Sequence, residues 1–290
     1  MRKWNMNEKR ARLLISCVDR PGIVAAVSRF LLEHGANIVQ SDQYTTDPVR
    51  GMFFMRIVFD LEDVDRSLQL IEEQFAQVAE QFDMNWHISA EKKIKRMAIF
   101  VSKEDHCLME LLWRWKAGEL PVEISMVISN YEDSREAVEA YGIPYFCVPV
   151  TPNTKKDAEQ KALYLMRDKV DFIVLARYMQ ILSSDFVSEY HHRIINIHHS
   201  FLPAFIGANP YKRAFERGVK LIGATAHYVT NDLDEGPIIE QDVLRVNHRY
   251  TVEELKVVGR QAERIALAKA VSWHIQDKVL VHENKTVVFD

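Results

Sequence analysis

The stretch IINIHHSFLP, residues 194–203, joins an apolar run to polar side chains at its end. The apolar lead-in predicts a buried strand that ends at His198, before a turn that contains Pro203. Asn196 and His198 are two residues apart, so on a strand they point to the same face, roughly 6–7 Å apart. Because ligands of open α/β sheets bind beyond the carboxyl ends of the strands, we expect this pair to face a ligand.

Strand and helix patterns alternate on both sides of this stretch. Strands are predicted at 96–101, 122–128, 145–148, 171–175, 194–198, 221–229 and 238–245, and helices at 104–116, 134–141, 155–167 and 251–276. Alternation of this kind predicts a parallel sheet that is covered by helices on both faces. The fold class is therefore α/β, with a Rossmann-like, doubly wound, mostly parallel sheet.

The first ninety residues follow a different pattern. Strands are predicted at 11–18, 37–44, 52–60 and 85–89, with helices at 23–34 and 65–82 and a loop at 47–51. The order β-α-β-β-α-β predicts a ferredoxin-like α+β module. We therefore divide the chain into a module at 1–90, a charged linker at 91–95 and a second domain at 96–290.

Composition limits the class of protein. The 290 residues carry a net charge of −4 with both signs interspersed, which argues against a nucleic-acid binder or a polybasic membrane binder. No apolar run approaches the length of a membrane span, and the start, Met1 to Arg12, lacks the apolar core of a signal peptide. Cys17, Cys107 and Cys147 are far apart, which fits a reducing compartment. We expect a soluble cytoplasmic protein.

A second polar stretch, TAHYVTNDLDEGP at 225–237, places Asp234 on a tight loop that Gly236 and a proline close. If Asp234 meets His198, carboxylate, imidazole and the amide of Asn196 form a set that suits acyl transfer. The amide can donate to a developing oxyanion, and the imidazole can hold or deliver a proton. The carboxylate can orient the imidazole and accept a proton from an attacking nucleophile. No Ser or Cys nucleophile is needed, so attack would be direct.

These motifs together resemble the folate-dependent formyltransferase family. The resemblance rests on Asn196-x-His198, Ser200-x-x-Pro203, His227-Tyr228-Val229 and Leu233-Asp234-x-Gly236-Pro237, and it runs from about Arg96 to His248. The segment ARYMQIL at 176–182 is similar to the family's folate-contacting segment. The resemblance implies that Asn196, His198 and Asp234 are catalytic, and that the folate binds near Met179, Ile181, Leu182, His227 and Gly236.

One loop separates the branches of this family. Members with phosphorylated acceptors carry a glycine-rich phosphate loop after the first strand, whereas this chain has VSKEDHC at 101–107, without glycine and with two carboxylates. The loop resembles that of the hydrolytic members, and the N-terminal module resembles an ACT domain. The resemblance implies hydrolysis of 10-formyltetrahydrofolate by water, which supplies formate for purine biosynthesis, with folate as the substrate and no further cofactor.

Two alternatives remain open. A formyltransferase that acts on a non-phosphorylated amine would use the same three residues. A non-catalytic amino-acid sensor built on the ACT module is a third hypothesis, which the presence of all three catalytic residue types disfavours.

Several residues have competing interpretations. Asp19, Gly22 and Asn37 could line an amino-acid effector site, or Asp19 and Gly22 could only form a turn and cap a helix. His227 could orient the acidic loop or be a structural strand residue. An ACT module covers its sheet edges best by pairing, so we expect a homodimer or homotetramer.

Paired histidines raise the question of a metal. His191 and His198 flank a predicted strand, and seven extended residues span roughly 23 Å, too far for one ion. We therefore expect no metal site.

Overall fold

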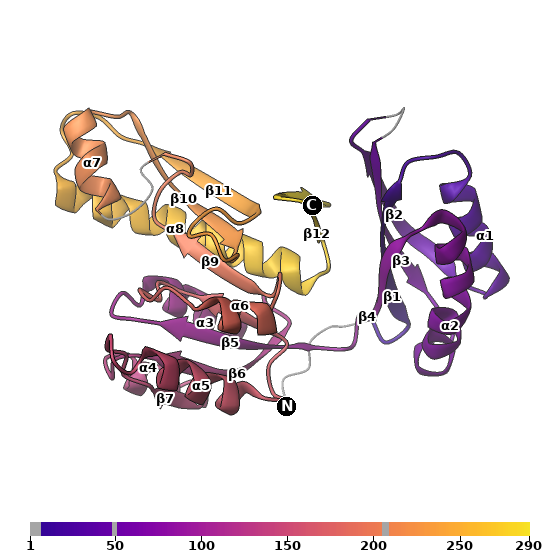
Figure 1. Ribbon diagram of the computed structural model, residues 1–290, viewed down its shortest axis with the longest axis horizontal. Helices are drawn as coiled ribbons and strands as arrows, with labels where there is room; N and C mark the ends of the chain where they lie inside the picture. The colour runs from indigo at the N-terminus through magenta and orange to yellow at the C-terminus, as the bar shows by residue number, and fades with distance from the viewer. Residues whose placement is uncertain (1–6, 48–50, 205–208) are drawn as a thin grey trace. The chain divides into compact units, whose positions relative to one another are not determined.

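The computed structural model describes residues 7–47, 51–204 and 209–290, so the first residues and most of the predicted loop at 47–51 lie outside the described residues. The chain forms two compact units (Figure 1). The first contains Met1–Ile94, Gln276–Leu280 and Val287–Asp290, and the second contains Lys95–Ile275 and Val281–Thr286.

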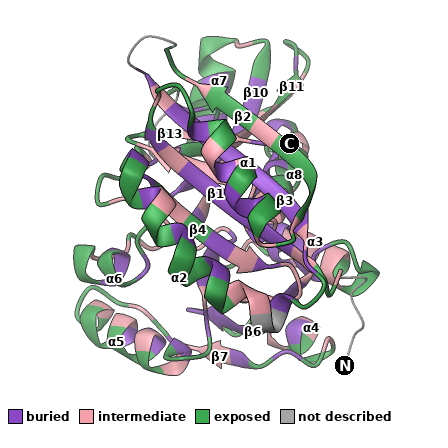
Figure 2. Cartoon of the chain, turned by 90° about the vertical axis from the view of Figure 1, so that its right-hand side faces the viewer, coloured by how far each residue is buried: buried purple, intermediate pink, exposed green. Residues whose placement is uncertain are grey.

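The first unit has the predicted ferredoxin-like order of elements. Its elements are β1 (Arg10–Val18), α1 (Ile23–Glu33), β2 (Asn37–Thr45), β3 (Met52–Asp60), α2 (Val64–Phe82) and β4 (Asn85–Ala90). The sheet order is β2-β3-β1-β4, and the pairs are antiparallel. Buried residues run along β1 and β3, whereas the outer faces of α1 and α2 are exposed (Figure 2).

The second unit is the predicted doubly wound domain. Its elements are β5 (Lys95–Val101), α3 (His106–Ala117), β6 (Val122–Ser129), α4 (Arg135–Glu139), β7 (Tyr145–Cys147), α5 (Lys155–Met166), β8 (Phe172–Leu175), α6 (Ser184–Glu189), β9 (Ile194–His198), α7 (Pro210–Arg217), β10 (Leu221–Tyr228), β11 (Ile238–Arg245) and α8 (Val252–Ile275). The sheet order is β11-β10-β9-β8-β5-β6-β7. The pairs from β9 to β7 are parallel, whereas β10 runs antiparallel to both of its neighbours, β9 and β11.

The end of the chain differs from the predicted boundaries. A short hairpin, β12 (Val279–His282) and β13 (Lys285–Val288), follows α8, and parts of this tail group with the first unit. The cause is a buried ion pair, because the carboxylate of Asp277 lies 3.3 Å from Arg12 Nη1 and accepts a 2.8 Å hydrogen bond from Ser89. A pairing across that many residues has no local sequence signal.

The sheet of the second unit brings the two polar stretches side by side. The strand β9 is central and its Ile194 and Ile195 are fully buried. In the antiparallel pair of β9 and β10, Asn196 lies opposite His227, and His198 lies opposite Thr225. Among the described residues, no helix combines the length and the apolarity that a membrane span requires.

Candidate active site

His198 and Asp234 form a close, mostly buried pair. His198 ends β9, and its Nδ1 lies 3.2 Å from Oδ2 of Asp234, in the loop between β10 and β11. Only 7% of the His198 side chain and 10% of the Asp234 side chain are exposed. Since Nδ1 faces the carboxylate, Nε2 is left for another partner, and it has none among the described residues. The structure therefore brings together the imidazole and the carboxylate that the sequence singled out.

The loop that carries Asp234 depends on a close backbone approach. Asp234 has a left-handed backbone conformation, with φ of +58°. Two residues on, a Cβ atom on Gly236 would lie 1.8 Å from the carbonyl oxygen of Tyr228, so only glycine fits there. The Tyr228 N–H donates to the Pro237 carbonyl over 2.9 Å, which fastens the loop to the end of β10.

Asn196 is oriented by His227. A carbonyl can only accept, so the 2.9 Å contact between His227 Nδ1 and the Tyr228 carbonyl places the imidazole proton on Nδ1. The free Nε2 then accepts from Asn196 Nδ2 over 3.1 Å. This bond fixes the amide and leaves its second N–H available. His227 thus touches the amide and also lies 3.7 Å from Asp234, so it is more than a structural strand residue.

Asp234 is an ionised carboxylate. Burial raises its pKa, but the neighbouring imidazoles of His198 and His227 lower it more, so the pKa lies well below the usual range. A carboxylate this acidic is a weak proton acceptor. It is better suited to stabilising a protonated His198 than to removing a proton from a nucleophile.

A cavity of about 950 Å³ opens over these residues. Its wall contains Asn196, His198 and Asp234, and also the predicted folate contacts Met179, Ile181, Leu182 and His227. Met179 and Ile181 are 58% and 60% exposed, as expected for apolar side chains that meet a ligand. Gly236 does not line this cavity, and its contact with Tyr228 shapes the loop instead.

A buried charged cluster, which we call the Glu263 cluster, lines the same cavity, and the sequence did not reveal it. It consists of His106, Arg177, Tyr211 and Glu263. Oε2 of Glu263 lies 2.8 Å from His106 Nε2, and Oε1 accepts a 2.6 Å hydrogen bond from Tyr211. Burial raises the pKa of Glu263, but the partners His106, Arg177 and Tyr211 lower it by more, so the pKa lies below its ordinary value. The group is therefore an ionised carboxylate with 1% of its side chain exposed.

The sequence features near these residues are only indirect signals of the Glu263 cluster. His106 lies in the loop that departs from the phosphate-binding pattern, and Arg177 lies in the folate-contacting segment. A Cβ on Gly259 would lie 2.1 Å from the Tyr211 hydroxyl, so a glycine one turn before Glu263 makes room for the tyrosine.

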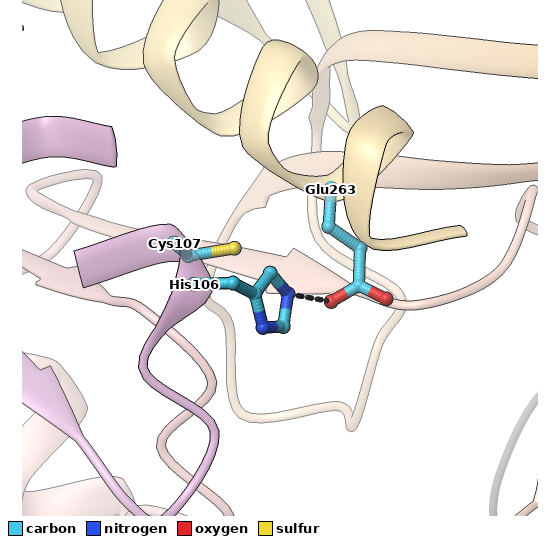
Figure 3. A group of neighbouring side chains, drawn as sticks. All are labelled: His106, Cys107 and Glu263. Atoms are coloured by element: carbon cyan, nitrogen blue, oxygen red, sulfur yellow. Dashed lines mark hydrogen bonds and ion pairs between the residues drawn. The ribbon is translucent and has the colours of Figure 1, made fainter. Parts of the chain in front are cut away.

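Two members of the Glu263 cluster, together with the adjacent Cys107, are residue types that bind metals. Side-chain atoms of His106, Cys107 and Glu263 lie within 4.8 Å of one another (Figure 3). However, both Glu263 oxygens already have partners, and Arg177 Nε is 3.4 Å from one of them. Burial holds the pKa of the Cys107 thiol well above its usual value, which disfavours the thiolate that metals bind. The side chains neutralise one another and do not form a cation cage.

The first unit has a separate pocket at the start of α1. It is lined by Asp19 and Gly22, but not by Asn37. Gly22 has φ of +98° and occupies the cap position of α1 without a side-chain cap, and Asp19 accepts a 2.8 Å hydrogen bond from Thr45 instead. Asp19 therefore ties the turn to β2 and does not cap the helix.

The fold and the site define a class of α/β enzymes that act on acyl groups, here with a small ferredoxin-like module at the N-terminus. The formyl transferase family model matches residues 95–271, and the ACT domain model matches residues 11–76. The chain is 60% identical to the formyltetrahydrofolate deformylase of Bacillus subtilis (strain 168), over 98% of this chain and 95% of that protein. The chain therefore belongs to the formyltetrahydrofolate deformylase family.

Solved structures agree with this assignment. A formyltetrahydrofolate deformylase from Pseudomonas syringae pv. tomato is 47% identical with a TM-score of 0.93, and the match covers 99% of this chain and 96% of that chain. Glycinamide ribonucleotide transformylase 1 from Symbiobacterium toebii is 26% identical with a TM-score of 0.65, and covers 69% of this chain and 97% of that one.

Proposed function

We propose that this protein hydrolyses 10-formyltetrahydrofolate to formate and tetrahydrofolate. The observation that carries the proposal is the arrangement of Asn196, His198 and Asp234 on one cavity wall. It occurs in a chain that is closely similar to proteins named for this reaction. Apolar side chains at the rim, Met179 and Ile181 among them, offer a surface for the flat pterin ring.

The geometry supports direct attack by water. His198 Nε2, the free imidazole nitrogen, takes one proton from water as its oxygen bonds to the formyl carbon. The free N–H of Asn196 donates to the oxyanion that forms. Asp234 stabilises the imidazolium, which then returns the proton to N10 as the carbon–nitrogen bond breaks. The formic acid released ionises to formate, so atoms and protons balance.

Two features favour water over a phosphorylated acceptor. The loop after β5 has no glycine, and Glu104 from this loop lines the cavity. Its negative charge opposes a phosphate. Transfer to a non-phosphorylated amine is the second candidate, because the same three residues serve both reactions.

The remaining partners are also proposals. The pocket near Asp19 and Gly22 is the expected site of a small amino-acid effector. The edge strand β2 exposes Ile38 and Val39, which favours pairing with a second copy as a homodimer or homotetramer. The free cysteines Cys17 and Cys107 suit the cytoplasm. A monomer in light scattering at micromolar concentration would contradict the oligomer.

The function is tested by incubating purified protein with 10-formyltetrahydrofolate in a buffer without amines. We expect formate and tetrahydrofolate in equal amounts, and loss of both products in Asp234→Ala. Folate binding without formate release would contradict hydrolysis, and a screen of small amines would then test formyl transfer.

A further inference from the structure

Unpartnered buried donors gather in one cavity. Among the described residues, the buried side-chain polar atoms without a hydrogen-bond partner are His198 Nε2, Arg177 Nε, Arg177 Nη1 and Glu240 Oε2. Glu240 is ion-paired with Lys269, whereas His198 and Arg177 both line the cavity described above. Buried polar atoms are normally satisfied, so the exceptions indicate where a ligand or water completes the site.

Arg177 is not neutralised fully by its neighbour. Its Nε lies 3.4 Å from Glu263 Oε2, which is an ion pair but not a well-aligned hydrogen bond. Glu263 already accepts from Tyr211 at one oxygen and contacts His106 at the other. The carboxylate is therefore occupied by other donors, and Nη1 of Arg177 has no acceptor in the described parts of the chain.

The backbone conformation of Arg177 is unusual and supports a role in ligand binding. The residue lies two positions after the end of β8 and has φ of +64°, a left-handed conformation that costs a side-chain-bearing residue about 1 kcal/mol. Its carbonyl accepts a 3.3 Å hydrogen bond from Ser102 N–H, which helps to hold this conformation. Such outliers persist where the surrounding structure enforces them, and they cluster at ligand sites.

Arg177 also acts on His199, the residue next to the reacting histidine. The ring of His199 is 5.3 Å from that of His198 and 5.9 Å from that of Tyr211, in the Glu263 cluster. Burial lowers the pKa of His199 to about 3, and the positive charge of Arg177 contributes. The cation is thus close enough to act on the neighbour of the catalytic imidazole.

We propose that Arg177 binds the carboxylate of the formate product. This inference rests on the proposed hydrolysis, which creates a small anion in this cavity. A planar guanidinium with free N–H groups matches a carboxylate in geometry and charge. Glu263, the carboxylate nearest to Arg177, already has His106 and Tyr211 as partners, so an incoming carboxylate can take the unused N–H groups of the guanidinium.

The experiment is a titration of the folate-free protein with ¹³C-labelled sodium formate at constant ionic strength, followed by NMR. We expect saturable binding by the natural protein and an affinity lower by about tenfold or more in Arg177→Met, because a charged hydrogen-bonded pair is lost. Arg177→Lys keeps the positive charge but loses the planar pair of N–H donors, so its affinity for formate should be intermediate.

Arg260→Met is the matched control. Arg260 lines the same cavity, but its guanidinium already pairs with Glu104 at 2.8 Å, so formate binding should match that of the natural protein. Near-ultraviolet circular dichroism establishes that each variant is folded, and Arg177→Lys keeps the test valid if Arg177→Met does not fold.

Unchanged formate affinity in Arg177→Met, or no saturable binding by the natural protein, would overturn the proposal. The outcome is separable from the hydrolysis assay. Formate binding through Arg177 without formate release from the folate would support the carboxylate site and contradict the hydrolytic function.

Discussion

The carboxylate of Asp234 illustrates how neighbouring side chains set the chemistry of one residue. Two imidazoles surround it, at 3.2 Å for His198 and 3.7 Å for His227, and together they outweigh the effect of its burial. The result is a permanent negative charge next to the imidazole that is proposed to move the proton. The role of Asp234 is therefore to hold and stabilise a cation.

Asp234→Asn tests that role. An amide keeps the shape but cannot stabilise an imidazolium, so we expect kcat to fall by about 10³-fold or more with the fold intact. The measurement is steady-state formate release. Asp232→Asn, an exposed position in the same loop, is the control and should retain activity. Near-normal turnover in Asp234→Asn would contradict the assigned role.

His199 predicts a pH dependence of stability. Its pKa is about 3 in the folded protein against an ordinary value of 6.5, so the unfolded chain binds more protons between these values. Stability therefore falls as the pH drops through this window. In His199→Gln, the loss of unfolding free energy from about pH 7 to about pH 5 should be smaller by at least ~1 kcal/mol. Urea unfolding measures it, with exposed His191→Gln as the control; equal losses in both variants would exclude the effect.

Some individual residues of the site could be predicted from the sequence, and others could not. Asn196 and His198 could be predicted, because strand geometry places alternate residues on one face. Arg177 and Glu263 could not be identified, because their pairing joins the segment after β8 to α8 and nothing local marks a buried glutamate on a helix. Asn37 was predicted at the effector pocket, but the structure does not place it in that lining.

At the scale of elements, the loop between β10 and β11 determines where the acid lies. Its hydrogen bond to the end of β10 and its close approach at Gly236 fix the backbone on both sides of Asp234. The turn was predictable from its Gly-Pro pair, but the approach to the Tyr228 carbonyl was not. The helix α7 was missed, although Pro210 at its start and Gly218 after its end are typical helix boundary signals.

Gly236→Ala should displace this loop. The added methyl group would lie 1.8 Å from a carbonyl oxygen, so the backbone must move and carry Asp234 with it. We expect kcat/KM to fall by about 10²-fold. Gly142→Ala is the control, because Gly142 has φ of +75° but no atom within 4 Å of the added group. The control should lose only about 1 kcal/mol of stability and no activity. Equal activity of the two variants would show that the loop tolerates the methyl group.

At the scale of the whole molecule, the C-terminal tail is divided between the two units. The helix α8, which carries Glu263, ends at Ile275, and Gln276 and Asp277 group with the first unit. Arg56 donates to the carbonyls of both residues, over 3.1 and 2.9 Å. Periodicity and turn signals predicted the order of elements in both units. They could not assign this tail, because its contacts join residues that are far apart in the sequence.

Asp277→Ala should destabilise the first unit. Removing one partner of a buried ion pair leaves Arg12 with only the more distant carboxylate of Glu91, at 3.8 Å, at a cost of about 3 kcal/mol. Amide hydrogen exchange in β1 and β4 measures the loss. The exposed Asp290→Ala serves as the control and should leave exchange unchanged. Equal protection in both variants would show that the pair is not what holds the tail.

The central claim is that water attacks the formyl carbon directly. It is tested most directly by a single turnover of 10-formyltetrahydrofolate in H₂¹⁸O without an added amine, followed by mass spectrometry of the products and of the protein. We predict formate that carries one ¹⁸O atom, in an amount equal to the tetrahydrofolate formed. A formyl group recovered on an amine or on a protein side chain, with no labelled formate, would contradict it.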